Sequence, residues 1–180
     1  QFVQWRVDLR EQQPDLKHRV SEIRRVAFRT ALEQSGLATT NAHTLAEQAF
    51  DVFWRLRQEV AMFEGSHALL ENLAKMYTLG ALSNGNACLT TIGLAPFFAF
   101  HFAAENFPAA KPAPDLFLAA LAKTGTAPDN SVHIGDHPVD DKQKKKNVGM
   151  KTLWVNLDNR EWPAHLPPAD ANVSTLSAIP

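Results

Sequence analysis

The chain has 180 residues, of which 45% are apolar and 21% are charged, proportions typical of a globular protein rather than a disordered or fibrous one. Eighteen Lys and Arg against nineteen Asp and Glu give a net charge of -1, which argues against nucleic-acid binding and against binding to anionic membranes. The single cysteine, Cys88, excludes an internal disulfide and fits a reducing, cytoplasmic location.

The first part of the chain is expected to be helical. Residues 5–63 contain little Gly or Pro, and their apolar residues recur at helical spacing. A first helix is expected to end at Gly36, and a second to begin after an N-cap at Asn41. The apolar stripe of the first helix consists of Val20, Ile23, Ala27 and Ala31. The apolar residues of the second are Leu45, Ala49, Val52, Phe53, Leu56 and Val60. The pattern predicts a helical hairpin.

Beyond Gly65, short apolar runs alternate with amphipathic stretches. The predicted strands cover 78–82, 99–103, 131–134, 152–155 and 171–174, and the predicted helices cover 66–75, 86–93, 114–123 and 139–148. This alternation predicts an α/β fold with a doubly wound parallel sheet, whose ligand site lies outside the carboxyl ends of the strands. We therefore expect a helical domain over residues 1–64 and a Rossmann-like core domain over residues 65–180.

Two of these strands are followed by segments suited to phosphate. Ser83, Asn84 and Gly85 offer a hydroxyl and backbone N–H groups at a strand end, although an ordinary turn with an N-cap is the alternative. Lys111 lies before Pro112 and Pro114, which fix an extended approach to a helix. Its ammonium group can neutralise phosphate charge there, and a solvated loop lysine is the alternative.

A third segment concentrates carboxylates. Asp136 follows an apolar strand and Gly135, and Asp140 and Asp141 come soon after it. Magnesium prefers such oxygen ligands, usually one or two carboxylates together with waters and a substrate phosphate. The alternative interpretation is a helix N-terminus whose acidic residues favour the helix dipole.

The order of the three segments, Ser-Asn-Gly, then Lys-Pro, then Gly-Asp with a following Asp, resembles the second, third and fourth motifs of the haloacid dehalogenase-like (HAD) hydrolases. The motifs span 65–156, and the helical segment before them is similar to the family's cap domain. Residues 81–86 and 151–156 look most like bacterial phosphatases of flavin mononucleotide and related ribityl phosphates. The resemblance implies a Rossmann-like HAD core with an α-helical cap.

The resemblance also implies roles for the phosphate-binding segments. Ser83 would hydrogen-bond the transferring phosphoryl group, helped by the backbone of Asn84. Lys111 would bind the same phosphate and moderate the charge of the nucleophile. These groups serve attack on phosphorus by an aspartate, followed by hydrolysis of the aspartyl-phosphate.

For the metal, the resemblance implies that Asp136 is a direct Mg²⁺ ligand. Asp141 would support the metal or the phosphate-binding lysine, with Asp140 as the alternative for that role. The lysine-rich helix that follows, 142–146, has almost no apolar face, so we interpret it as solvated, with a nucleic-acid patch as the weaker alternative.

The first motif of the family, Asp-x-Asp-x-Thr, carries the nucleophile and precedes the cap. None of the ten aspartates of this chain lies two positions from another. Gln1 is not a start methionine, and the chain opens within the expected cap. We therefore expect the motif to lie upstream of these 180 residues, and we expect these residues alone to be inactive.

Together these features predict a cytoplasmic, Mg²⁺-dependent phosphatase of a small phosphorylated metabolite such as a flavin or sugar phosphate. No nucleic-acid or membrane partner is expected, and the oligomeric state stays open. Two other functions stay open as well. One is a non-catalytic module of the same fold that binds a phospho-ligand or a protein, and the other is a metal-independent dehalogenase.

Overall fold

The computed structural model describes residues 2–138 and 148–180. Its helices are α1 (Phe2–Gln12), α2 (Val20–Gln34), α3 (Thr39–Arg57), α4 (Ser66–Met76) and α5 (Asp115–Thr124). Its strands are β1 (Gly80–Ser83), β2 (Phe100–Ala103), β3 (Val132–Gly135), β4 (Lys151–Val155) and β5 (Ala171–Val173). None of the helices among these residues is long and apolar enough to cross a membrane.

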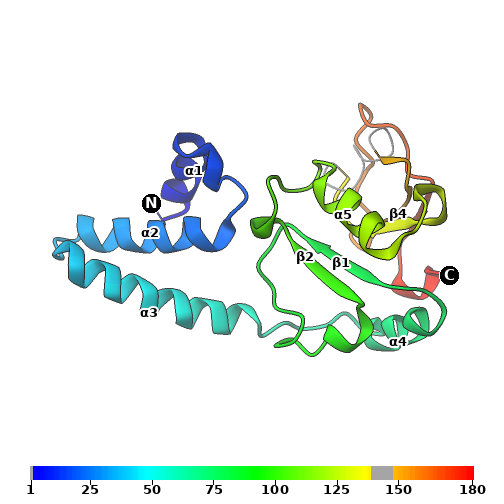
Figure 1. Cartoon of the computed structure of the whole chain (residues 1–180), viewed down its shortest axis with the longest axis horizontal. Helices are drawn as coiled ribbons and strands as arrows, with labels where there is room; N and C mark the ends of the chain where they lie inside the picture. The colour runs from blue at the N-terminus through cyan, green and yellow to red at the C-terminus, as the bar shows by residue number, and fades with distance from the viewer. Residues whose placement is uncertain (1, 139–147) are drawn as a thin grey trace.

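Helix α2 packs on both α1 and α3 at one end of the molecule, and the strands lie at the other end (Figure 1). The stripe predicted on α2 is confirmed at its centre, where Ile23 and Ala27 are fully buried. The helix ends at Gln34, and Gly36 then takes a φ of +94°, a left-handed conformation that glycine adopts without strain. The division into domains at residues 64 and 65 remains a prediction.

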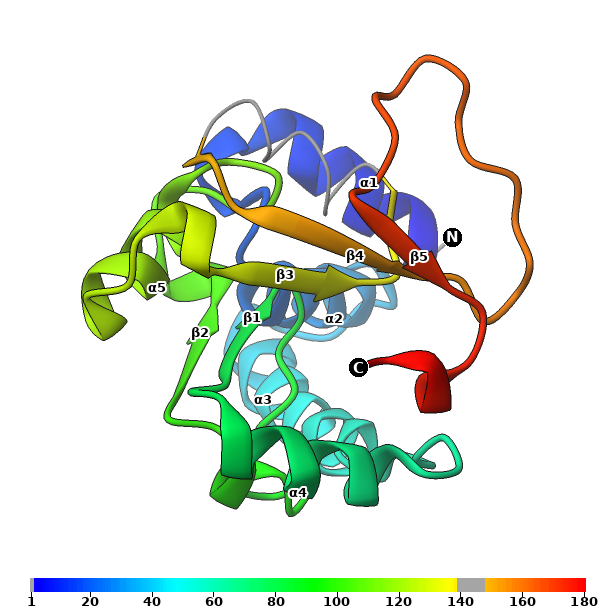
Figure 2. The same ribbon diagram turned by 90° about the vertical axis from the view of Figure 1, so that its right-hand side faces the viewer.

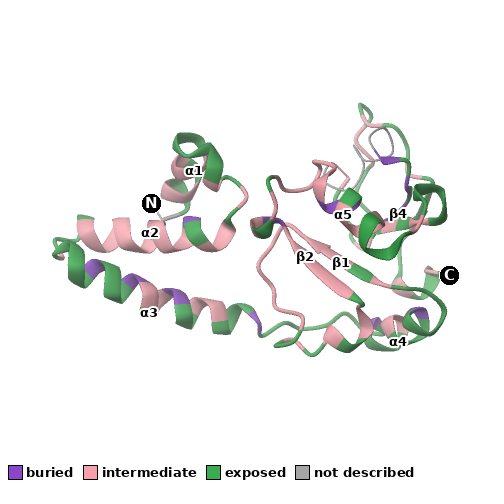
Figure 3. Ribbon diagram, in the orientation of Figure 1, coloured by how far each residue is buried: buried purple, intermediate pink, exposed green. Residues whose placement is uncertain are grey.

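Helix α3 differs from its prediction in its start and in its buried face. It begins at Thr39, so the predicted N-cap at Asn41 is wrong and Ala38 holds that position. The face toward α2 is formed by Ala42, Ala46 and Phe50, which are buried (Figure 3). The small alanine side chains allow a short distance between the axes of α2 and α3.

The larger apolar side chains of this segment lie away from that contact. These exposed residues are Leu45, Val52, Leu56 and Val60. The sequence pattern identified an amphipathic helix correctly, and two of the predicted residues, Ala49 and Phe53, are partly buried. The buried positions are two alanines and Phe50, none of which was predicted.

All the strand pairs are parallel, as the alternating pattern predicts, and they form two sheets (Figure 2). In one, β1 pairs with β2, and Ser83 lies opposite Ala103. In the other, β4 lies between β3 and β5. The observed strands start or end within two residues of the predicted ones. The fold is α/β, with parallel sheets and helices, as expected.

The predicted helix over 86–93 is wrong. Residues 89–93 form turns, closed by a hydrogen bond from the Ile92 amide to the Cys88 carbonyl oxygen at 3.0 Å. The amides of Leu94 and Ala95 then both donate to one carbonyl oxygen, that of Leu89. Three β-branched residues followed by a glycine in this segment disfavour a continuing helix. The predicted helix over 139–148 lies outside the described residues, except for its last position.

In the part of the chain that the structure describes, every strand except β4 has one unpaired edge. Strand β1 has one hydrogen-bonded neighbour, β2, and strand β3 has one neighbour, β4. On β3, the apolar side chains of Val132 and Ile134 are 55% and 40% exposed. The β1 and β3 edges each have no second strand beside them among the described residues, so a further strand could pair there.

Helix α5 joins the two sheets through its buried face. Phe117 is fully buried and packs with Val148 and Met150, just before β4. Leu82 of β1 and Leu121 of α5 pack against the same cluster. The core therefore holds the ends of both sheets against one helix.

Candidate active site

The first site segment is a tight loop at the carboxyl end of β1. The Gly85 amide donates a hydrogen bond to Ser83 Oγ at 2.9 Å. Because a hydroxyl both accepts and donates, the Ser83 proton stays available to a ligand oxygen. A Cβ atom at Gly85 would lie 3.4 Å from Ser83 Oγ and 3.9 Å from Arg57 Nη2, so glycine leaves room next to this hydroxyl.

Two hydrogen bonds join this loop to the lysine segment. Asn84 Nδ2 donates to the carbonyl oxygen of Lys111 at 2.9 Å, and the Lys111 amide donates to Asn84 Oδ1 at 2.8 Å. One side-chain amide thus satisfies both backbone groups of the lysine, across 27 positions of sequence. The structure therefore brings together the two segments in which phosphate ligands are predicted.

Asp136 follows β3, and its backbone is held by two donors. Trp154 Nε1 donates to the Asp136 carbonyl oxygen at 3.1 Å, and Arg160 Nη2 donates to the same oxygen at 3.3 Å. Trp154 is buried and meets Trp162 edge-on, with ring centroids 4.8 Å apart. We call these two contacts the Trp154–Arg160 clamp. It fixes the backbone of Asp136 while its side chain lies exposed.

Of the predicted metal ligands, Asp136 alone lies among the described residues. The Asp136 side chain has no hydrogen-bond or ion-pair partner there, and the described residues contain no group of three or more potential metal ligands. An unpartnered carboxylate on a fixed backbone fits Mg²⁺, which takes one or two protein carboxylates and otherwise water and phosphate. Asp140 and Asp141, and the lysine run 142–146, lie outside the described residues.

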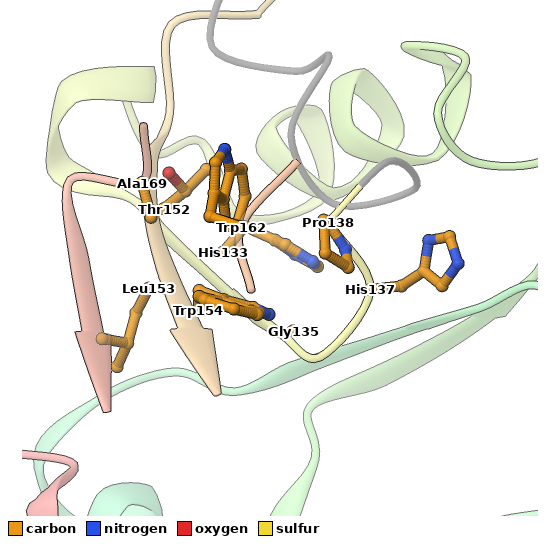
Figure 4. A pocket seen from close by; sticks show the side chains of 9 residues that line it. All are labelled: His133, Gly135, His137, Pro138, Thr152, Leu153, Trp154, Trp162 and Ala169. Atoms are coloured by element: carbon orange, nitrogen blue, oxygen red, sulfur yellow. The ribbon is translucent and has the colours of Figure 1, made fainter. Parts of the chain in front are cut away.

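A small cavity lies next to the clamp, between Trp154, Trp162, Gly135 and Thr152 (Figure 4). Its volume is about 10 Å³, which holds at most one water molecule. It is therefore no substrate site. Among the described residues, Asp136 makes no hydrogen bond or ion pair with Ser83 or Lys111.

The helical segment also contacts the loop after β1. Asn86 Nδ2 donates to Ser21 Oγ of α2 at 3.2 Å, and the Cys88 amide donates to Gln58 Oε1 at 2.7 Å. The reasoning from sequence did not include Arg57, whose guanidinium approaches Gly85. No motif marks this residue, and only its position at the last turn of α3 brings it to the loop.

Comparison with known proteins identifies the family. A model of the haloacid dehalogenase-like hydrolases matches residues 12–155, most of the chain. The chain belongs to this family. The resemblance to the HAD hydrolases stated from sequence is thus confirmed, and the roles of the Ser-Asn-Gly, Lys-Pro and Gly-Asp segments stay predictions.

Several HAD phosphatases are similar in sequence. The chain is 28% identical to the 5-amino-6-(5-phospho-D-ribitylamino)uracil phosphatase YigB of Escherichia coli, over 95% of this chain and 73% of the relative. It is 32% identical to a phosphoglycolate phosphatase of Caulobacter vibrioides, over 83% of this chain and 69% of the relative. It is 32% identical to a phosphoserine phosphatase of Thermus thermophilus, of which it spans about half (53%).

A solved structure is closer in sequence than these phosphatases. A 2-haloacid dehalogenase from Pseudomonas syringae superposes with a TM-score of 0.91 at 38% identity, over 98% of this chain and 76% of that one. The proteins similar to this chain therefore include both phosphatases and a dehalogenase.

Proposed function

We propose that the full-length protein is a cytoplasmic, Mg²⁺-dependent HAD phosphatase of a small phosphorylated metabolite, with flavin and sugar phosphates as candidates. The observation that carries this proposal is the pair of hydrogen bonds between Asn84 and the backbone of Lys111. These bonds hold the loop that carries the Ser83 hydroxyl and Gly85 against the backbone of Lys111. A hydroxyl and an ammonium group supplied by two such segments would suit the oxygens of a phosphoryl group. Neither a nucleic acid nor a membrane is a proposed partner.

The proposed roles follow from the chemistry of each group. Ser83 donates its hydroxyl proton to a phosphoryl oxygen, together with the backbone of Asn84. Lys111 neutralises phosphoryl charge. Asp136 holds Mg²⁺ and Asp141 supports it, with Asp140 as the alternative. The metal, when bound, supplies further positive charge that stabilises the transferring phosphoryl group.

We also propose that the nucleophilic aspartate is upstream of these 180 residues and that helices α1–α3 act as a cap. The absence of any Asp-x-Asp pair from the sequence supports an external nucleophile. The unpaired edges of β1 and β3 also support it, because a parallel strand between them would carry its own carboxyl end to the same region. On this proposal, attack by that aspartate gives an aspartyl-phosphate that water hydrolyses, and the 180 residues alone are inactive.

The test is hydrolysis of p-nitrophenyl phosphate by the protein expressed from its complete reading frame. We expect turnover with Mg²⁺, loss of turnover in excess EDTA, and recovery when Mg²⁺ is restored. Binding of phosphate esters without hydrolysis would instead favour the non-catalytic module. The 180-residue chain, assayed in parallel, is expected to show no turnover.

The dehalogenase is a second candidate because of the 38% identity to the enzyme of Pseudomonas syringae. Its discriminating feature is independence from metal. Release of chloride from 2-chloropropionate by the full-length protein in excess EDTA, without hydrolysis of phosphate esters, would establish it in place of the phosphatase.

Replacing Trp154 by Phe tests the Trp154–Arg160 clamp. The change removes the indole N–H and keeps an aromatic ring against Trp162. A hydrogen bond of this kind contributes about 0.5–1.5 kcal/mol, so we expect the Mg²⁺ concentration for half-maximal activity to rise about two- to tenfold. Mg²⁺ titration of activity and calorimetric Mg²⁺ binding both measure this change.

The control is Trp162→Phe. Trp162 Nε1 donates to the Leu166 carbonyl oxygen, so this variant loses an indole N–H of the same pair without touching Asp136. We expect its Mg²⁺ affinity to stay at the wild-type value. Equal Mg²⁺ affinity in both variants would show that the clamp does not position the metal ligand.

A further inference from the structure

Three arginines of the helical segment act electrostatically on a fourth, Arg24. We call them the arginine cluster: Arg6 and Arg10 of α1, Arg24 of α2 and Arg57 of α3. The described residues supply no carboxylate within 4 Å of any of them. Arg24 and Arg57 are brought near each other by Phe53, because Arg24 stacks on this ring and Phe53 lies one helical turn before Arg57 on α3.

The pKa of Arg24 is affected by burial and by the other three arginines. Burial lowers the pKa of its guanidinium, and repulsion from the other three members lowers it further. Its charge lies 3.7 Å from the centre of the Phe53 ring, a cation–π contact that holds it in place. An anion placed among these groups would relieve the repulsion and would be bound for that reason.

One member of the cluster, Arg57, lies beside the loop after β1. We call this loop, residues 83–86, the phosphate loop. The Cβ position at Gly85 is 3.9 Å from Arg57 Nη2 and 3.4 Å from Ser83 Oγ, so the guanidinium and the hydroxyl border the same point. The hydrogen bond between Asn86 and Ser21 holds the first turn of α2 against the same loop. Positive charge therefore lies beside the loop at Arg57.

We propose that the arginine cluster binds a second anionic group of the substrate, a carboxylate or a second phosphate on the leaving group. This inference rests on the proposed phosphatase function and narrows its substrate class to phosphomonoesters that carry a second anionic group. The transferring phosphoryl group has its own ligands in Ser83 and Lys111. Arg24 stacks on Phe53, one helical turn before Arg57 on α3, so the proposal assigns these two guanidinium groups to the leaving group beside the loop.

The neighbouring residue of α2 provides a matched control. Arg25 lies 3.8 Å over the Phe50 ring, just as Arg24 lies over Phe53. Unlike Arg24, it is paired with a carboxylate, that of Glu47 at 2.9 Å. It lines a hollow between α2 and α3 and is not a member of the cluster. Arg25→Gln therefore removes the same kind of stacking contact and one charge, without removing an unpaired cation.

The test compares three short esters with the full-length protein: ethyl phosphate, phosphoglycolate and ethylene glycol bisphosphate. We expect the wild type to have its lowest KM for phosphoglycolate or for ethylene glycol bisphosphate, the two esters with a second anionic group. Which of these two has the lower KM identifies the second group as carboxylate or phosphate. Arg24→Gln and the exposed Arg57→Gln are each expected to raise that KM about tenfold, the effect of one charge-assisted hydrogen bond. Their KM for ethyl phosphate is expected to change less than about twofold.

Each outcome bears on the proposal. Arg25→Gln should keep the wild-type preference among the three esters. An equal rise in KM for all three esters in Arg24→Gln and Arg57→Gln would overturn the inference, because the cluster would then act on the transferring phosphoryl group. The inference would also be overturned if the wild type had no lower KM for the two esters with a second anionic group than for ethyl phosphate.

Calorimetry separates this inference from the proposed function. If no ester is hydrolysed, the phosphatase proposal fails, and binding of phosphoglycolate then decides the role of the cluster. Binding that weakens about tenfold in Arg57→Gln and not in Arg25→Gln would support the anion site without hydrolysis. Equal binding in wild type and both variants would overturn it.

Discussion

Replacing Asp136 by Asn in the full-length protein is expected to abolish Mg²⁺-dependent hydrolysis of phosphate esters. The exposed carboxylate has no partner within the described residues, and a neutral amide is a much poorer ligand for a hard cation. Changes to groups that merely support metal ligands cost about 10–100-fold in affinity, so loss of a direct ligand is expected to exceed that range. Steady-state rates across a Mg²⁺ titration, with calorimetric Mg²⁺ binding, measure the effect.

The substitution also keeps the local fold. Trp154 and Arg160 donate to the backbone carbonyl of Asp136, which the change to Asn leaves in place. Asp129→Asn is the control, because that carboxylate precedes the opposite end of β3. We expect its rate and Mg²⁺ affinity to match the wild type. Normal Mg²⁺ affinity in Asp136→Asn would remove Asp136 from the metal site.

The strands were predictable because their signal is local. The runs that became β1, β3 and β4 are short, apolar and bounded by Gly or polar residues, and the strands lie within two residues of the expected positions. The turns over 89–93 were not predictable from the same rule. A segment of that length also fits a single helix between two parallel strands, and only the detailed order of β-branched residues favours turns.

The site was predictable only in its parts. Ser83 and Asp136 follow strands in the sequence and Lys111 precedes two prolines, so all three were found as candidates. The amide of Asn84 that joins two of these segments spans 27 positions, and nothing in the sequence indicates which backbone groups it meets. The same holds for Arg57, which approaches Gly85 only because α3 ends beside the loop after β1. Contacts of this kind follow from tertiary packing, which hydrophobic periodicity and local propensity do not predict.

Replacing Asn84 by Ala is expected to lower kcat/KM of the full-length protein about 10–100-fold. Both hydrogen bonds to the Lys111 backbone are lost, so the lysine segment is no longer fixed against the phosphate loop. Removing a direct charge-stabilising donor in other enzymes costs about 10²–10³ in kcat, and a residue that positions such a group should cost less. The partly buried backbone groups also lose a partner, which should reduce the free energy of unfolding by about 1–3 kcal/mol.

A double-mutant cycle distinguishes positioning of Lys111 from a general loss of stability. If Asn84 acts through the ammonium group, Asn84→Ala should have little further effect on kcat/KM in a protein that already carries Lys111→Gln. Asn86→Ala is the matched control, because it removes one side-chain hydrogen bond of the same loop, to Ser21, without touching Lys111. Additive losses in the cycle, or equal losses in Asn84→Ala and Asn86→Ala, would contradict the assigned role. Because Asn84 contacts only the backbone of Lys111 in these bonds, the coupling measures how far the position of the ammonium group, rather than its charge alone, determines the rate.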